Sequence, residues 1–158
     1  SLLAKEGLRL ATLQRDLDGV RDALMRRINV NNAERVNSHE LEANYGSLAL
    51  FALSWGSSAL LIASENGDLD IVHTLLDARA DVNKANCVED TPLHAAAFKG
   101  HVDVVAKLLG VRDINIHHAY KHYQTALDGA RKQLGEGRSV NHEQVVALLE
   151  KAHADGPN

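Results

Sequence analysis

Three histidines, His117, His118 and His122, lie within six residues of the sequence. Imidazole nitrogens are ligands for zinc, and Cys87, the chain's single cysteine, could add a thiolate. However, no second cysteine and no HExxH pattern accompanies them, and adjacent side chains of an extended segment point to opposite sides. The sequence therefore predicts neither a metal site nor a cofactor.

Catalysis by acid–base or nucleophilic groups would need a different arrangement of residues. His94 has the chemistry of a general base, but the sequence lacks a nucleophile elbow, a glycine-rich phosphate loop and a Ser/His/Asp pattern. Gly135-Glu136-Gly137 is an isolated G-x-G with no strand before it, which indicates a turn. The acidic residues of the central segment form no close pair suited to proton transfer: Glu65, Asp70, Glu89 and Asp103. The chain is predicted not to be an enzyme.

Composition and charge narrow the class of protein. The 158 residues suit a single domain, and the formal net charge of -4 argues against nucleic acid or an anionic membrane as a partner. A single cysteine excludes an internal disulfide and fits a reducing compartment. Charged residues recur from Lys5 onward, unlike a signal peptide, and the longest apolar run is far too short to span a bilayer. We therefore expect a monomeric protein of the cytoplasm, with the nucleus as an alternative.

A repeated apolar pattern shows which elements must carry these residues. SALLIASENGDLDIVHTLL (58–76) and TPLHAAAFKGHVDVVAKLL (91–109) are offset by 33 residues and agree at seven of nineteen positions. In the second copy Thr91 is a good helix N-cap, Pro92 suits the first helical position, and Gly100 ends the short helix. Neither this helix nor the next is long enough to be stable alone, so such pairs must stack. The second helix is predicted from apolar residues spaced by three and four: Val102, Val105, Leu108 and Leu109.

This pattern resembles the ankyrin repeat, whose usual core reads T-P-L-H-x-A-A-x-x-G-H-x-x-V-V-x-x-L-L. ADVN at 80–83 is similar to the family's G-A-D-V-N ending, and weaker copies lie at 8–31 and 124–152. The resemblance implies an all-α fold, an ankyrin repeat solenoid of stacked helix-turn-helix pairs with β-hairpin fingers, in one domain over 1–158. The expected repeats are about 3–31, 58–90, 91–124 and 125–154.

The first repeat and the segment after it depart from the pattern. Residues 8–31 lack the TPLH motif and the glycine, so they resemble a capping repeat with a polar outer face. Residues 32–57 are an insertion in the first finger, where the spacing of Asn37 and Glu40 predicts a short helix that Gly46 can end. Its apolar residues either cover the stack, which we favour, or form an exposed docking surface. The polar residues available to the outer face of the cap are Arg9, Gln14, Arg15 and Arg21.

Two fingers lack a glycine that the family usually has two residues before the Thr of TPLH, where φ is positive. Gly56 conforms to this rule, whereas Glu89 and Tyr123 take the position in the later fingers. These two turns are expected either to hold strain or to adopt another shape.

The resemblance also implies where a partner would bind. In ankyrin proteins the variable positions that face the groove lie before the TPLH motif and at the end of the first helix. Trp55, Val88 and Phe98 are expected to form an apolar strip that anchors a partner, unless the insertion covers Trp55. His94, by contrast, is expected to tie one repeat to the next. The full set of partner-binding positions is Ser54, Trp55, Ser57, Glu65 and Asn66, then Cys87, Val88, Asp90, Phe98 and Lys99, then Lys121, His122, Gln124, Lys132 and Gln133.

The function that these expectations favour is binding of another protein by a non-enzymatic scaffolding or targeting module. The alternative is a regulatory or substrate-recruiting ankyrin segment of a larger enzyme, because the chain begins at Ser1 without Met and is expected to be a piece of a longer protein. A third reading is modification: Leu75 followed by Asp81-Val82-Asn83 is similar to sites that asparaginyl hydroxylases use on ankyrin repeats. The same residues are also simply the ending of the repeat.

Overall fold

The computed structural model describes residues 2–33, 55–119, 124–137 and 140–156. Within these ranges the chain forms helices and turns, and no β-strand is present. The helices are, in order, α1 (Leu2–Leu13), α2 (Leu17–Met25), α4 (Ala59–Asn66), α5 (Leu69–Asp77), α6 (Pro92–Lys99), α7 (Val102–Leu109), α8 (Ala126–Gly135) and α9 (Val140–Asp155).

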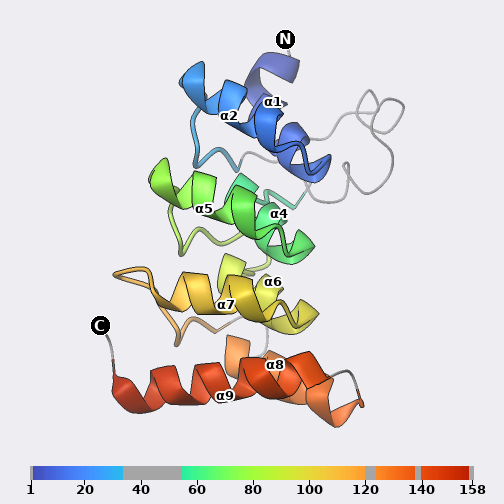
Figure 1. Cartoon of the computed structure of the whole chain (residues 1–158), viewed down its shortest axis with the longest axis vertical. Helices are drawn as coiled ribbons and strands as arrows, with labels where there is room; N and C mark the ends of the chain where they lie inside the picture. Colours follow the sequence, from blue (N-terminus) through green and yellow to red (C-terminus); the bar gives the residue numbers. More distant parts are fainter. Residues whose placement is uncertain (1, 34–54, 120–123, 138–139, 157–158) are drawn as a thin grey trace.

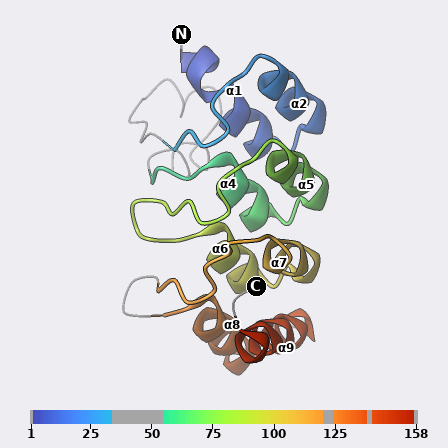
Figure 2. The same cartoon turned by 90° about the vertical axis from the view of Figure 1, so that its left-hand side faces the viewer.

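The helices stack as successive helix-turn-helix pairs along the long axis of the molecule (Figure 1). The first helices of the pairs, α1, α4, α6 and α8, pack against one another in an inner layer, and α2, α5, α7 and α9 form the outer layer (Figure 2). The described residues of the connections from one pair to the next, which we call fingers, lie beside the inner layer (Figure 2). The predicted all-α solenoid is confirmed.

The ends of α6 show why the sequence folds this way locally. The Thr91 hydroxyl accepts the backbone N–H of His94, and Pro92 occupies the first turn. Gly100 ends the helix at φ 77°, a left-handed conformation that costs glycine little. Gly67 ends α4 in the same way at φ 75°. A methyl group built there would lie 2.6 Å from the His101 ring of the next pair, so this turn accepts only glycine without rearrangement.

The core runs without a break from the first pair to the last. It consists of buried Ala, Leu, Val and Ile side chains that lie between the two layers. Leu60, Leu93 and Leu108 are each 1% exposed or less. Small alanines such as Ala63 and Ala96 let the inner helices approach closely.

Polar contacts at the inner turns join each pair to the next. The guanidinium group of Arg15 donates to Asp68 Oδ1, and the distance from Arg15 Nε to this oxygen is 2.8 Å. His101 Nε2 lies 2.9 Å from the carbonyl oxygen of Glu65, and His142 Nε2 lies 3.0 Å from that of Phe98. The two histidine contacts cap carbonyl groups at the ends of α4 and α6 that the helices themselves leave unpaired.

The fingers are linked by asparagine side chains. Asn31 Oδ1 accepts the backbone N–H of Asp81, and Asn83 Oδ1 accepts that of Asn115 in the next finger. Asn83 Nδ2 also donates to the carbonyl oxygen of Asp113, so both ends of its amide are engaged. In the finger before α6, Glu89 has φ 67°, so this position has the expected positive φ and holds strain at a non-glycine residue.

A buried ion pair in the first pair of helices corrects one expectation. Arg9 was expected on the outer face of the cap, but it is 1% exposed and pairs with Glu6, its Nε lying 2.6 Å from Glu6 Oε2. Arg9 aligns with Leu61 and His94, which are also buried. Arg9 Nη1 donates to the carbonyl oxygen of Ser57, and Asn32 Nδ2 lies 3.4 Å from Glu6 Oε1.

The predicted short helix and apolar residues of the insertion, at 34–54, lie outside the described residues.

The described helices include no segment that is both long enough and apolar enough to cross a membrane.

Candidate functional site

A groove opens on the inner layer between α6 and α8, beside the fingers. Its volume is about 330 Å³. The floor carries small or apolar groups, among them Ala95, Ala126 and Gly129, and the rim carries charged ones. We use the name "groove" for the surface lined by Glu65, Asp90, His94, Ala95, Phe98, Lys99, Gln124, Thr125, Ala126, Gly129 and Lys132.

Phe98 is the aromatic residue of the groove. It stands near the end of α6 and is 45% exposed. Its position is fixed from behind, because its carbonyl oxygen accepts from His142 of the following pair. Among the described large hydrophobic residues, Met25 is the other exposed one, and it lies on α2 in the outer layer. The groove therefore presents an aromatic ring to solvent on a rigid support.

The charges at the end of α6 are partly matched within the chain. Lys99 Nζ lies 3.5 Å from Glu65 Oε1 across the α4–α6 contact, with both side chains about half exposed. An exposed pair of this kind adds little to stability. Lys132 on α8, also exposed, has no ion-pair partner among the described residues.

Asp90 ends the finger before α6 and is held there by its backbone. Its N–H donates to Asn86 Oδ1 at 3.0 Å, and its carbonyl oxygen accepts the N–H of Asn86 at 2.9 Å. The side chain is half-buried. This burial, together with the nearby Glu65 carboxylate, raises the pKa of Asp90 to about 7.

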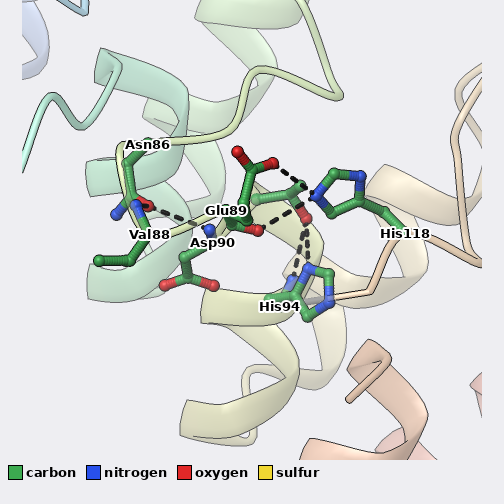
Figure 3. A network of polar contacts seen from close by, with 7 residues as sticks. Asn86, Val88, Glu89, Asp90, His94 and His118 are labelled. Atoms are coloured by element: carbon green, nitrogen blue, oxygen red, sulfur yellow. Dashed lines mark hydrogen bonds and ion pairs between the residues drawn. The ribbon is translucent and has the colours of Figure 1, made fainter. Parts of the chain in front are cut away.

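His94 lies under the same rim in a polar network (Figure 3). Its Nδ1 is 2.7 Å from the Thr91 hydroxyl, and its ring meets that of His118 edge-on at 5.8 Å. Burial, and then the charge on His118, lower the pKa of His94 to about 4. His118 Nε2 reaches back to Glu89, at 3.2 Å from the carbonyl oxygen and 3.4 Å from the carboxylate. A neutral, enclosed His94 with these partners joins two fingers to α6, which fits the structural role expected of it.

Comparison with known proteins decides the family. A family model described as ankyrin repeats (three copies) matches residues 9–119, more than half of the chain. The chain belongs to the ankyrin repeat family.

Proteins similar to this chain come from animals. The chain is 28% identical to the ANK repeat-containing protein nipk-1 of Caenorhabditis elegans over 109 residues, 65% of this chain and 18% of that protein. It is 38% identical to the E3 ubiquitin-protein ligase hecd-1 of the same organism over 104 residues, 66% of this chain and 4% of the ligase. Ankyrin repeat domain-containing protein 49 of Mus musculus is 46% identical over 54 residues, 34% of this chain and 23% of that protein. The chain thus spans less than a fifth of the first two relatives.

The ankyrin groove brings together several of the predicted binding residues. Those lining it are Glu65, Asp90, Phe98, Lys99, Gln124 and Lys132. Sequence reasoning missed the floor, which is formed by Ala95, Thr125, Ala126 and Gly129. A signal was available, because Ala95 and Gly129 occupy the same position of the first helix in successive repeats.

Other predicted binding residues lie elsewhere, and two of them are corrected. Ser57 is 4% exposed, and its carbonyl oxygen accepts a hydrogen bond from Arg9 Nη1. Gln133 is 2% exposed within α8. Asn66 is half-buried and its Nδ2 lies 3.4 Å from the carbonyl oxygen of Thr12. The remaining residues of the set outside the described part of the chain are Ser54, Lys121 and His122.

The expected apolar strip is divided between two places. The backbone N–H of Cys87 donates to the carbonyl oxygen of Trp55 at 2.9 Å, so these two fingers lie side by side, and Cys87 is exposed. Trp55 and Val88 are half-buried in these fingers. Phe98 lines the groove, whereas neither Trp55 nor Val88 does.

The histidines considered as metal ligands go to different partners. The ring of His117 meets that of His153 at 4.8 Å, whereas His118 contacts Glu89 and His94. His122 lies outside the described residues. Among the residues that the structure covers, no group of three or more His, Cys, Asp or Glu side chains could hold a metal ion.

Proposed function

We propose that this ankyrin repeat chain is a non-enzymatic module that binds another protein through the groove. Ankyrin repeats are generally protein–protein interaction modules. The observation that carries the proposal is Phe98, an aromatic side chain 45% exposed at a cavity of about 330 Å³. Exposed aromatic residues with a charged rim are the usual anchors of protein interfaces. Trp55, Val88 and Cys87 on the neighbouring fingers would extend the contact.

The same proposal includes the oligomeric state and the cellular location of the protein. A net charge of -4 disfavours nucleic acid and anionic membranes as partners. The exposed thiol of Cys87 fits a reducing compartment, so we place a monomer in the cytoplasm or the nucleus.

The test compares two exposed apolar residues. The partner would be captured on the immobilised chain, identified by mass spectrometry and titrated by calorimetry against Phe98→Ala and Met25→Ala. Phe98→Ala is expected to weaken binding by about 2 kcal/mol, because it removes a groove anchor. Met25→Ala, on the outer layer, is the matched control and should bind like the wild type. Wild-type affinity in both variants would move the site away from the groove.

A second candidate function is favoured by one relative. The chain matches a short part of a protein named as an E3 ubiquitin-protein ligase, so the same groove could recruit a substrate for a catalytic domain elsewhere in a longer protein. Sequencing the complete transcript separates the two functions. A ligase or other catalytic domain in the same reading frame favours recruitment, and its absence favours an independent adaptor.

A further inference from the structure

The carboxyl group of Asp90 reaches the groove without a partner in the described part of the chain. The backbone of Asp90 is fixed on both sides by Asn86, whereas its carboxyl oxygens make no hydrogen bond or ion pair with any described residue. Figure 3 shows this carboxyl group turned away from His94 and from the contact between Glu89 and His118. A half-buried carboxyl group without a partner costs free energy, and a rigid turn keeps it in place.

A second carboxylate lines the same part of the groove. Glu65 is close enough to Asp90 to disfavour its ionisation. The ammonium group of Lys99 lies beside Glu65, and this lysine side chain is 47% exposed. The groove therefore carries two acidic groups and two exposed bases, and one of these bases, Lys99, is already paired with Glu65.

Resting on the function proposed above, we propose that the groove seats a basic side chain, lysine or arginine, of the partner protein between Asp90 and Glu65. The partner's cation would give the Asp90 carboxylate the positively charged neighbour that it lacks. The aliphatic stem of the same side chain would lie against Ala95 and the ring of Phe98. Arginine fits best, because its planar guanidinium can bond two carboxylates and stack on an aromatic face.

An acidic ligand is a poorer match to the same surface. It would be drawn to Lys132, but that ammonium group is exposed on a long flexible stem and is already well solvated. Asp90 is held by its backbone and has already lost part of its water, so a cation placed there regains more interaction energy. Binding must then release a proton, since the cation favours the ionised form of Asp90.

The test uses random peptides of about twelve residues displayed on phage and selected on the immobilised full chain at about pH 8. The best peptide would be synthesised and titrated by calorimetry. We expect it to contain a lysine or arginine whose replacement by norleucine weakens binding at least about tenfold, a loss typical of a desolvated charge pair. In Asp90→Asn the same replacement should change the affinity little, whereas Asp70→Asn, on the outer helix α5, should behave like the wild type.

The pH dependence is the second readout. Affinity should rise about tenfold from about pH 6 to about pH 8, as the ionised fraction of a carboxyl group with a pKa of about 7 rises by that factor. Asp90→Asn should abolish this rise. A urea titration of Asp90→Asn confirms that the variant is folded.

The outcomes separate this inference from the function on which it rests. Peptides that lose binding in Phe98→Ala but contain no required basic residue, or bind Asp90→Asn as well as the wild type, overturn the inference alone. If the selection enriches no peptide that depends on Phe98, the proposed groove function is overturned and the inference falls with it.

Discussion

Asp90, just before α6, and His94, in the first turn of α6, have pKa values shifted in opposite directions. The pKa of Asp90 is raised from 3.8 to about 7, and the pKa of His94 is lowered from 6.5 to about 4. Both shifts are caused chiefly by burial. Between about pH 4 and 7 the folded chain holds a proton on Asp90 that the unfolded chain has lost, so this residue makes stability fall as pH rises. His94 does the reverse, because unfolding lets it take up a proton below 6.5. The two effects oppose each other over most of this range.

Replacing Asp90 by Asn should separate the contributions of Asp90 and His94 to the pH dependence of stability. At about pH 8 the variant should be more stable than the wild type by about 1 to 3 kcal/mol, since one pKa unit corresponds to about 1.4 kcal/mol and the site is partly solvated. Below about pH 3 the difference should vanish, because wild-type Asp90 is then protonated in both the folded and the unfolded state. Urea unfolding at several pH values measures this, with Asp70→Asn as the control. A difference that stays constant from acid to neutral pH would contradict the pKa assigned to Asp90.

At the scale of elements, glycines that look alike in the sequence differ in their conformation and surroundings. Gly67 ends α4 with φ 75° and faces the His101 ring. Gly129 lies within α8, and a methyl group added there would meet no heavy atom within 4 Å. The first glycine is required by its conformation, and the second is not.

The same substitution should therefore have opposite effects at these two positions. Gly67→Ala should destabilise by about 2 kcal/mol or more, because alanine resists a positive φ and its methyl group displaces His101. Gly129→Ala should stabilise by about 0.5 to 1 kcal/mol through its higher helix propensity. Thermal and urea melts of the two variants decide the matter, and two losses of similar size would mean that α8 is not a regular helix around Gly129.

The helices and their order could be predicted from sequence because each signal is local. Thr91, Pro92 and Gly100 set the bounds of α6, and apolar spacing marks α7. The groove was predicted less completely. Ser57 and Arg9 are buried and contact each other although they lie 48 positions apart in the sequence. No local sequence pattern predicts such a contact. Similarly, the partner of Phe98 is His142, which depends on how neighbouring pairs stack.

At the scale of the whole molecule, one core joins all the helix pairs, so no pair is a separate unit. Leu93 on α6 and Leu108 on α7 are 1% and 0% exposed and belong to this core. Lys99, on the same helix as Leu93, is 47% exposed. Neighbouring pairs stabilise one another through such shared contacts.

Truncation at these positions should show that coupling. Leu93→Ala or Leu108→Ala should each cost about 2 to 5 kcal/mol and lower the midpoint of the entire unfolding transition. Lys99→Ala should cost less than about 1 kcal/mol, because it loses only an exposed ion pair. Circular dichroism and tryptophan fluorescence followed through urea titrations provide the measurement. Comparable losses at core and surface positions would show that the helix faces are misassigned.

The ion pair of Glu6 and Arg9 has a consequence for how this chain can change over time. Asn32 and Ser57, on either side of residues 34–54, are both bonded to that pair. Their separation is thus fixed by the first helix and not by the residues between them. Closing a longer loop costs little extra entropy once its ends are held. We therefore expect the solenoid to keep its register when the number of residues between positions 33 and 55 is changed.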